Sequence, residues 1–344
     1  MNLDERKQKI LRAVVHEHVR TAEPVASEQI MAAIQIGVKS ATIRNEMAEM
    51  AELGFLQQPH TSAGRIPSDM GYRFYVDWLM TKPIAMPSIP TIAEATQVRE
   101  QSAVDDLMAA TCHLLSALTH LTALATAPTS DSLTLTWIEL RKVSSEKLMV
   151  LTLWSNGQLR HAIVHLPSVS ESVIQKAGRM LSEDLTGYSQ ERLCRGFVVP
   201  DRVAMSEEGR LETVLVEVVR QIAVDASCPE VFIDGTSCFA RQPEFREREA
   251  MELVLSVLEE HDTVAKLLQA AAVGGQPQVV IGRENPLEPL RSCSLVAASY
   301  GTSSGIQGSL GVCGPTRMDY AGVTRAVRFA AKNLSSALSD VLPS

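Results

Sequence analysis

Aromatic residues are scarce in this sequence and make up only 4% of its 344 residues. We therefore expect cores built from Leu, Val, Ile, Ala and Met, without the large buried areas that aromatic rings supply. Basic residues are outnumbered as well, and the formal charge is −8 at pH 7. This net acidity argues against bulk electrostatic attraction to nucleic acid or to an anionic membrane, although it leaves room for a local basic surface.

Signatures of catalytic and metal sites are missing too. None of the 6 cysteines belongs to a Cys-x-x-Cys pair and no histidine lies at zinc-finger spacing, so we expect buried thiols in a reducing cytoplasm. No pair of nucleophile and base is marked by the sequence, and we expect no enzyme, no metal and no cofactor. No apolar run approaches the ~18 residues of a membrane helix. No apolar segment follows the opening MNLDERKQKI, so we expect neither a leader peptide nor a membrane partner.

Three helices are predicted near the start of the chain. Apolar residues recur at helical spacing over residues 3–21. A short helix follows the turn at Pro24, with Ser27 as its expected N-cap. The third helix carries the run SATIRNEMAEM, with Ser40 as its expected N-cap and Gly54 as the residue that ends it.

A hairpin and a fourth helix follow these three. Two short extended pieces flank a loop at residues 60–64, and Pro67 lies near the first turn of the next helix. The order of helix, helix, turn, helix and hairpin predicts a winged helix-turn-helix over residues 1–80. Three prolines in TKPIAMPSIPTI then mark a linker at residues 81–92.

Beyond the linker the spacing of apolar residues changes more than once. A long helical pattern covers residues 93–125, and LTWIELRKV, KLMVLTLW and LRHAIVHLP then read as strands. Helical patterns return before a second group of strands and a closing helix. Strands on both sides of a mostly helical middle predict an α+β fold. In it one sheet domain, residues 93–169 and 256–344, is interrupted by an insert at residues 170–255.

Two of these helices are candidates for self-association. The pattern over residues 93–125 fits either a dimer coil or a core helix packed on the sheet, and we favour the core helix. The insert contains LETVLVEVVRQIAV, whose apolar stripe would need a partner outside the sheet. We therefore predict that this stripe is the self-association surface.

The helix that starts at Ser40 has the composition of a DNA-reading helix. If Ile43 points inward, Asn45 points outward and Thr42 and Arg44 lie on the flanks. In helix-turn-helix proteins the first turns of the second helix enter the major groove. There arginine pairs with guanine, asparagine with adenine, and threonine can contact a thymine methyl group.

Other side chains and the loop are expected to position the backbone of the duplex. Basic residues and the helix amino terminus can meet phosphates, and the loop at residues 60–64 would act as the wing. The predicted DNA contacts are Lys39, Ser40, Ala41, Thr42, Arg44, Asn45, Gln58, His60, Thr61, Ser62, Arg65 and Arg73. The alternative is a winged-helix module for protein partners, since any amphipathic helix has a polar face and the charges of the first 80 residues nearly cancel. A dimer would double each DNA contact.

Long blocks of this sequence resemble one protein family. SATIRNEMAEMAELGFLQQPHTSAGRIPSDMGYRFYVD is similar to the amino-terminal signature of HrcA, the heat-inducible transcription repressor family. The similarity continues in family order through GTSCFARQPEF, VVIGREN, CSLVAASY and GSLGVCGPTRMDY. These blocks span nearly the whole chain, and the first and last are long and specific.

The resemblance implies a function and a set of partners. Members are bacterial repressors that bind as homodimers to an inverted-repeat operator upstream of chaperone operons of the groE and dnaK type, and heat relieves the repression. It also implies a winged helix, a GAF-like domain that is interrupted by a dimerising insert, and dependence on the GroE chaperonin. The DNA-contacting elements carried over are the helix from Ser40 and the wing around residues 60–65.

Two further motifs have both a functional and a structural interpretation. In GIQGSLGVCGPTRMDY a glycine occurs at every third position before Arg317, which could form an anion cradle, but a hairpin and a turn explain it better. In IGREN the polar residues could form a site, although Asn285 before Pro286 is typical of a turn. Because GAF-like domains often hold small ligands, a ligand-gated transcriptional regulator is the alternative function.

Overall fold

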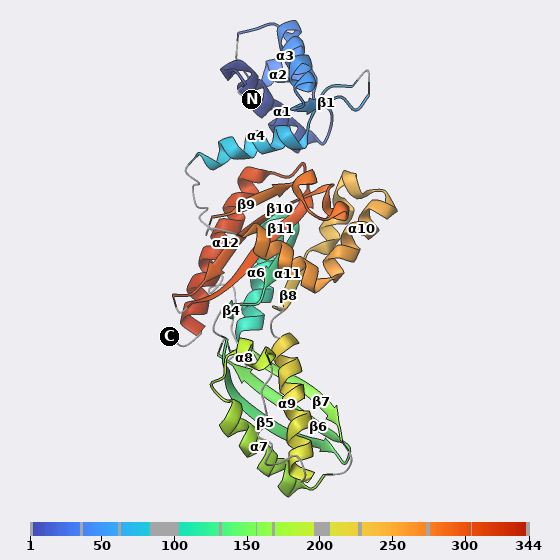
Figure 1. The fold of residues 1–344 in the computed structure, drawn as a ribbon. Coiled ribbons are helices and arrows are strands. Elements are labelled where there is room, and N and C mark those ends of the chain that lie inside the picture. Colours follow the sequence, from blue (N-terminus) through green and yellow to red (C-terminus); the bar gives the residue numbers. More distant parts are fainter. Residues whose placement is uncertain are drawn as a thin grey trace.

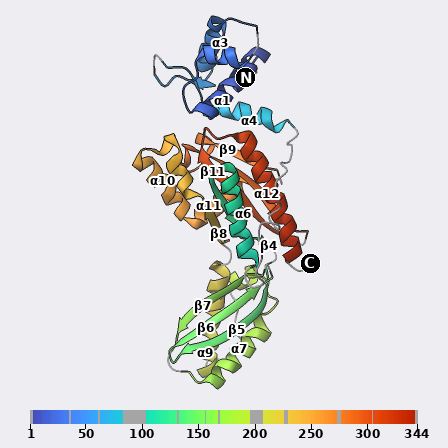
Figure 2. The same cartoon turned by 180° about the vertical axis from the view of Figure 1, so that it is seen from behind.

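The computed structural model has three parts in a row (Figure 1), an amino-terminal unit, a central domain and an insert. Figure 2 shows the same order from behind. The structure describes residues 3–34, 37–60, 63–82, 103–130, 133–155, 157–166, 169–195, 207–225, 229–272, 276–303 and 305–341.

The amino-terminal unit consists of helices around a small apolar core, with one two-stranded hairpin. Asp4 caps the first helix by accepting from the backbone N–H of Lys7 at 2.9 Å. The Ser68 hydroxyl caps the fourth by accepting from Gly71 at 3.1 Å. The elements are α1 (Glu5–Thr21), α2 (Ser27–Ala33), α3 (Ser40–Glu52), β1 (Leu56–Gln57), β2 (Ile66–Pro67) and α4 (Asp69–Met80).

The helix boundaries in this unit differ slightly from the prediction. Neither Ser27 nor Ser40 is an N-cap, because each is the first helical residue of its helix. Their hydroxyl groups lie 2.9 Å apart and hydrogen-bond to each other, which links α2 to α3. Gly54 follows the C-cap of α3 with φ +84°, as expected of the glycine that ends a helix.

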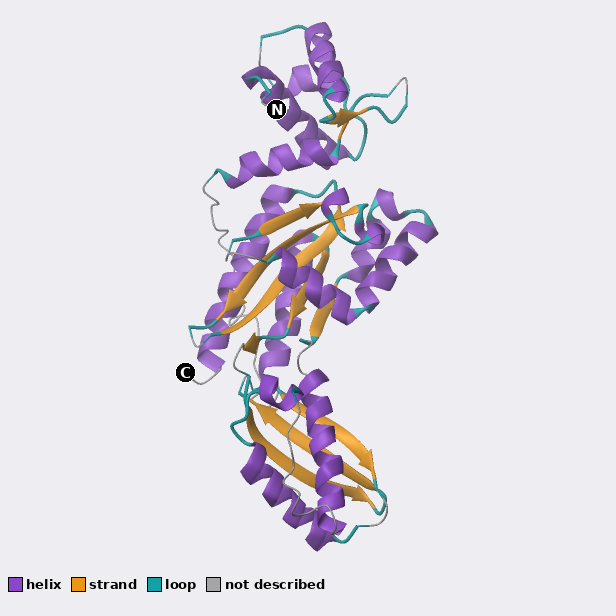
Figure 3. Cartoon of the chain, in the orientation of Figure 1, coloured by secondary structure: helices purple, strands orange, loops and turns teal. Residues whose placement is uncertain are grey.

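The central domain contains a six-stranded antiparallel sheet with helices on both faces (Figure 3). Its strands run in the order β8-β3-β11-β10-β9, with β4 paired to β11. The first face packs on α6 and α12, and the second packs on α10 and α11. The elements are α6 (Ala103–Thr119), β3 (Thr122–Thr126), β4 (Thr129–Ser130), β8 (Val231–Asp234), α10 (Arg248–Glu259), α11 (His261–Ala271), β9 (Gln278–Ile281), β10 (Cys293–Gly301), β11 (Ile306–Pro315) and α12 (Tyr320–Val341). Four 3₁₀ turns complete it: η1 (Thr236–Arg241), η2 (Pro243–Phe245), η3 (Gly282–Glu284) and η4 (Glu288–Leu290).

The long helix predicted for residues 93–125 ends early. Residues 93–102 lie outside the described residues, and α6 stops at Thr119. His120 then takes a left-handed conformation with φ 55°, and the chain enters β3. Every residue of β3 is buried, so its apolar run has no period-two alternation that could distinguish it from a buried helix. The preference for a core helix is confirmed, since Leu107, Met108 and Leu115 pack against the sheet.

The insert has its own sheet and its own core. Three antiparallel strands pair only in the order β5-β6-β7, and helices cover one face of that sheet. Trp154 is 1% exposed at the centre of this second core. The elements are β5 (Leu135–Ser144), β6 (Lys147–Trp154), β7 (Leu159–His165), α7 (Glu171–Leu185), α8 (Gln190–Cys194) and α9 (Glu207–Asp225).

The strand pairing moves the predicted domain boundaries. The sequence analysis assigned residues 93–169 to the sheet domain and 170–255 to the insert. Instead β5, β6 and β7 pair with one another and pack on α7 and α9, while α10 packs on the central sheet. Period-two spacing identifies a strand but does not say which sheet it joins. An interrupted sheet was predicted correctly, since β3 and β4 precede the insert and the other four strands follow it.

Two smaller predictions concern the thiols and the membrane. Cys112, Cys293 and Cys313 are buried as expected, whereas Cys194 and Cys238 are partly exposed. Burial raises the pKa of the Cys112 thiol to about 12. Within the ranges given above, no helix combines the length and the apolar character needed to cross a bilayer.

Candidate nucleic-acid interface

The face of α3 that was predicted to point outward is exposed. Ala41, Arg44 and Asn45 are all exposed, and they lie on its first two turns. The opposite face is buried in the core of the unit through Ile43, Met47 and Met50. Helical spacing fixes this arrangement, because residues three and four apart share one side of a helix. In Figure 1, α3 lies at the end of the unit that faces away from the central domain.

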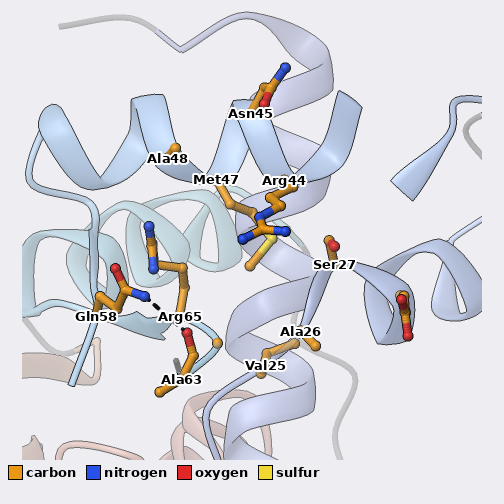
Figure 4. Close-up of a pocket in the computed structure, with 12 residues that line it drawn as sticks. Val25, Ala26, Ser27, Arg44, Asn45, Met47, Ala48, Gln58, Ala63 and Arg65 are labelled. Atoms are coloured by element: carbon orange, nitrogen blue, oxygen red, sulfur yellow. Dashed lines mark hydrogen bonds between the residues drawn. The ribbon is translucent and has the colours of Figure 1, made fainter. Parts of the chain in front are cut away.

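A hollow of about 530 Å³ opens beside this face. Figure 4 shows Arg44, Asn45 and Ala48 on its α3 side and Ser27 at the start of α2. Gln58 and Arg65 come from the β1-β2 hairpin on its other side. The hollow therefore joins the exposed turns of α3 to the hairpin, and two guanidinium groups line it. Glu28 adds one carboxylate to the lining.

The hairpin is held against the turn before α2. Val25 and Arg65 exchange two backbone hydrogen bonds, each of 2.9 Å. A Cβ on Gly64 would lie 2.3 Å from the carbonyl oxygen of Val25, so only glycine permits this approach. Close to the tip, the Gln58 side chain donates to the carbonyl oxygen of Ala63 at 3.2 Å.

The other predicted contacts lie in the hairpin loop and at the start of α3. His60 is exposed, and its carbonyl oxygen accepts from the Ala63 N–H at 2.9 Å. Thr61 and Ser62, both predicted contacts, lie outside the described residues. Lys39, immediately before α3, is exposed, and Thr42 is half-buried.

The acidic side chains of α3 are partly neutralised from α1. The Lys7 ammonium lies 3.2 Å from carboxylate oxygens of both Glu46 and Glu49, and Arg6 lies 3.3 Å from Glu46. Hydrogen bonds to Asp4, Glu46 and Glu49 raise the pKa of Lys7 above its ordinary value. These pairs draw negative charge toward α1, which leaves Arg44 and Asn45 to define the outer face.

Arg73 is not available in the way that the sequence suggested. It was predicted to meet phosphates, but its guanidinium contacts the central domain. Its Nε donates to Glu284 at 2.7 Å, and its Nη2 donates to the carbonyl oxygen of Val279 at 2.6 Å. A side chain engaged in this way from α4 belongs to the contact between the unit and the central domain, so we remove it from the set of candidate DNA contacts.

Sequence reasoning missed Lys7 as a residue of the interface. Lys7 is four residues before the buried Leu11, so it lies on the inner side of α1. Its partners lie on a different helix about 40 positions later, as the Arg6–Glu46 pair with a separation of 40 illustrates. No local spacing signals such a pair.

Comparison with known proteins identifies the family. The heat-inducible transcription repressor HrcA of Carboxydothermus hydrogenoformans is 33% identical over 339 residues, covering 98% of this chain and 99% of that protein. The HrcA of Pelotomaculum thermopropionicum is 34% identical over 99% of both chains. Residues 105–324 match the family described as the HrcA protein C-terminal domain. This chain belongs to the HrcA family.

A third relative supports the family assignment, and one solved structure has a similar fold. The HrcA of Symbiobacterium thermophilum is 35% identical over 97% of this HrcA-family chain and 98% of its own. These three relatives are named as transcription repressors, and none of the names describes an enzyme. A crystal structure of a hypothetical protein covers 99% of this chain and 100% of its own with a TM-score of 0.66. At 21% identity that likeness supports the fold alone.

Proposed function

We propose that this HrcA-family chain represses transcription of heat-inducible genes by binding DNA through α3. The observation that carries the proposal is the exposed face of Ala41, Arg44 and Asn45 beside the hollow that ends at the hairpin. Arginine and asparagine can each make two hydrogen bonds to a base edge, and a small residue allows close approach. The protein-partner alternative has no comparable observation in its favour.

The amino-terminal unit acts as a winged helix-turn-helix in this proposal. Helices α2 and α3 form the helix pair, and the β1-β2 hairpin is the wing. Arg44, Asn45 and Thr42 read bases, while Lys39, Arg65 and the amino terminus of α3 at Ser40 position the phosphates. Gln58 and His60 extend the contact along the wing.

The surface for a homodimer differs from the one the sequence favoured. The apolar stripe of α9 was predicted to associate with a second copy. That stripe is buried inside the insert through Leu211, Leu215, Val219 and Ile222, against the inner face of the β5-β6-β7 sheet. Its buried residues are committed to the core of the insert, so a different surface carries self-association in our proposal.

The uncovered face of the same sheet takes that role in our proposal. Trp137, Leu159 and Ile163 are 39%, 59% and 51% exposed on it. Leu153 lies between Trp137 and Leu159, and Met149 lies opposite Ile163. Figure 2 shows this face in front of α7 and α9. Exposed apolar side chains on an uncovered sheet face are typical of a protein-protein interface, and a second copy is the simplest occupant of this one.

Two-fold pairing of these sheets would leave both reading helices free. The insert and α3 lie at opposite ends of the molecule (Figure 1). A dimer presents two copies of α3 to an inverted repeat, which is how a weakly charged head gains affinity. We propose an inverted-repeat operator upstream of chaperone operons of the groE and dnaK type, bound in the cytoplasm at the nucleoid and released on heat stress.

The central domain is GAF-like in this proposal, with a structural rather than a sensory role. The apolar space between its sheet, α10 and α11 amounts to about 10 Å³, less than a small molecule needs. The ligand-gated alternative is therefore not favoured. A dependence on the GroE chaperonin is proposed from the family resemblance.

Fluorescence anisotropy tests the function directly. A labelled duplex that carries the inverted repeat of a chaperone promoter is titrated with the full chain at about 0.15 M salt. We expect a dissociation constant on the order of 10⁻⁸ M or tighter, and binding at least roughly 10³-fold weaker to a scrambled duplex. Heating should abolish the specific binding over a narrow range. Equal affinity for the two duplexes would reject the proposal.

A further inference from the structure

Three sequence blocks that are far apart in the chain converge on one end of the central domain. They are RQPEF after β8, IGREN after β9 and GPTRMDY before α12. Each contributes a residue that touches or supports the amino-terminal unit. Figures 1 and 3 show α4 lying across this end, beside β9 and the start of α12. We call these contacts the seat of the amino-terminal unit. It consists of Asp69, Arg73, Gly282, Glu284, Glu244 and Arg317.

Arg73 and Glu284 form the first part of the seat. The Arg73 guanidinium donates from both Nε and Nη2 to the two carboxylate oxygens of Glu284, a planar fork that fixes orientation as well as distance. Nη2 also donates to the carbonyl oxygen of Val279 on the edge strand β9. Glu284 is itself held, since its Oε2 accepts from the Ile281 N–H at 2.8 Å. The fork therefore joins α4 to a sheet edge and not to a free loop.

Asp69 and Gly282 form the second part. One Asp69 oxygen accepts from the backbone N–H of Arg283 at 3.0 Å. Gly282 has φ +50°, and a Cβ there would lie 2.5 Å from the Asp69 carboxylate. The turn is rigid, because the buried Asn285 amide donates to the carbonyl oxygens of Gly282, Leu290 and Cys293 at 3.0–3.1 Å. The Asp69 carboxylate at the start of α4 thus packs directly against the backbone of Gly282 and Arg283.

Arg317, just before α12, forms the third part of the seat by contacting α1. Its Nη1 donates to the Val19 carbonyl oxygen at 3.0 Å, and its Nε donates to Glu244 at 2.6 Å. Only 13% of its side chain is exposed. The anion cradle considered for this segment is therefore replaced by an internal contact. An aromatic contact accompanies these polar ones, since the ring centroids of Tyr72 on α4 and Tyr320 on α12 lie 5.7 Å apart.

Helix α1 connects this seat to the reading helix. Its carboxyl-terminal part packs on the central domain through Val15 and Val19. Its amino-terminal part holds α3 through Leu11 and through the Lys7 pairs with Glu46 and Glu49. A helix of 17 residues is stiff over this length, so a fixed seat at one end fixes the direction of α3 at the other.

We infer that the seat makes Arg73, Glu284 and Arg317 positioning residues, which set the half-site spacing that the repressor dimer accepts. The inference rests on the proposed function, since spacing has meaning only for a dimer on an inverted repeat. The physical reason is geometric. Two reading helices can meet successive major grooves only if each head is held at one angle to the body that carries the dimer contact. An amino-terminal unit that is released from its seat still binds one half-site, but the dimer no longer discriminates between half-site spacings.

The test compares Glu284→Gln and Arg73→Gln with the wild-type chain on duplexes of different spacing. Glu284→Gln keeps the volume and one acceptor but loses the charged fork. Anisotropy is measured on the preferred spacing, on spacings shifted by about half a helical turn and on a single half-site. We expect both variants to bind the preferred duplex roughly tenfold more weakly, with an unchanged affinity for the single half-site. The discrimination against shifted spacings should shrink by the same factor. The control is Glu252→Gln, which breaks an exposed pair with Arg248 on α10 and should leave the spacing profile unchanged.

A measurement without DNA separates this inference from the proposed function. Small-angle X-ray scattering of the Glu284→Gln chain should show a broader distribution of intramolecular distances than the wild type, because the amino-terminal unit is no longer held at one angle to the central domain. Identical scattering and an identical spacing profile, in a variant with wild-type circular dichroism, overturn the inference while operator binding stands. If the wild-type chain binds no duplex at all, the proposed function fails and the spacing role falls with it, whatever the scattering shows.

Discussion

The ammonium group of Lys7 on α1 lies 3.2 Å from a carboxylate oxygen of Glu46 on α3, and only 14% and 13% of the two side chains are exposed. The same ammonium lies 3.0 Å from Asp4 and 3.2 Å from Glu49. One cation therefore serves three carboxylates, one at the N-cap of α1 and two on α3. Networks of this kind contribute more than isolated surface pairs, because each charge is held by several partners.

Replacing Lys7 by methionine should loosen α3. The methionine keeps the apolar stem but removes the cation that Glu46 and Glu49 share, which leaves the partly buried Glu46 with the more exposed Arg6. Uncompensated carboxylate charge then remains on the helix that would face the phosphates of bound DNA. We expect a lower melting temperature by calorimetry and weaker operator binding by anisotropy. Lys9→Met is the matched control, because Lys9 is 49% exposed and its ion pair among the described residues is with Glu5 of its own helix. Equal effects of the two substitutions would show that the Lys7 network does not position α3.

Truncating Arg44 tests the assignment of the base-reading face. Arg44→Ala removes an exposed guanidinium without disturbing the core beneath it. The loss should be about 1–3 kcal/mol on the operator, with less discrimination at one base position. Competition with single-base variants of the duplex measures both quantities. Arg248→Ala, an exposed arginine on α10, should have no effect. Wild-type affinity and discrimination in a folded Arg44→Ala chain would remove this residue from the interface.

An aspartate on the open sheet face of the insert should separate the subunits. Ile163 is 51% exposed in a single chain, and Ile163→Asp places a carboxylate where the second copy would bury it. Burying the unpaired carboxylate of each subunit in the interface then costs at least about 1–3 kcal/mol. Analytical ultracentrifugation should show monomers, and operator affinity should fall with dimerisation. Leu253→Asp on α10, where the leucine is 54% exposed, is the control and should remain dimeric. A dimeric Ile163→Asp chain would place the interface elsewhere.

His18, which is close to the Arg317 guanidinium of the seat, should make the stability of the fold sensitive to acid. Burial is the main cause that lowers its pKa, and the nearby Arg317 guanidinium lowers it further, against the Glu23 carbonyl that accepts from its Nδ1 at 2.9 Å and the charge of Glu244. A histidine with a lowered pKa binds its proton more readily when unfolded. Its contribution to stability is therefore complete above the ordinary pKa of about 6.5 and is lost as pH falls below that value.

Denaturant titrations between about pH 5 and pH 8 check this sign. His18→Gln should reduce the loss of stability on acidification. His16→Gln, on the exposed side of the same helix, should leave the pH dependence as it is in the wild type. A steeper dependence in His18→Gln would mean that the protonated imidazole stabilises the fold.

The sequence predicted local structure better than long-range contacts. The faces of α3 followed from spacing alone, since Ile43 and Met47 share a buried side and Asn45 lies opposite. The strands β5, β6 and β7 were found from their period of two. Their separate sheet was not, because pairing partners are chosen by packing on α7 and α9, which no local pattern encodes.

The same limit explains the residues that changed role. Arg73 has an amphipathic helix around it, which suggests an outward cation, but its partner Glu284 is 211 positions away. The stripe of α9 suggested a surface because its own sheet was assigned to another domain. In both cases the side chain was correctly judged to need a partner, and only the three-dimensional fold identifies which one.

The position of β3 in the chain has a cost during synthesis. This fully buried strand pairs with β11 and β8, and the hydrogen bond between Thr126 and Ser309 spans 183 positions. A ribosome therefore releases an uncovered, aggregation-prone strand and makes the entire insert before either neighbour exists. Folds with such late closure are slow and depend on assistance to escape self-association. The interrupted sheet thus leaves the nascent polypeptide with an exposed apolar strand for the whole time that the insert is being made.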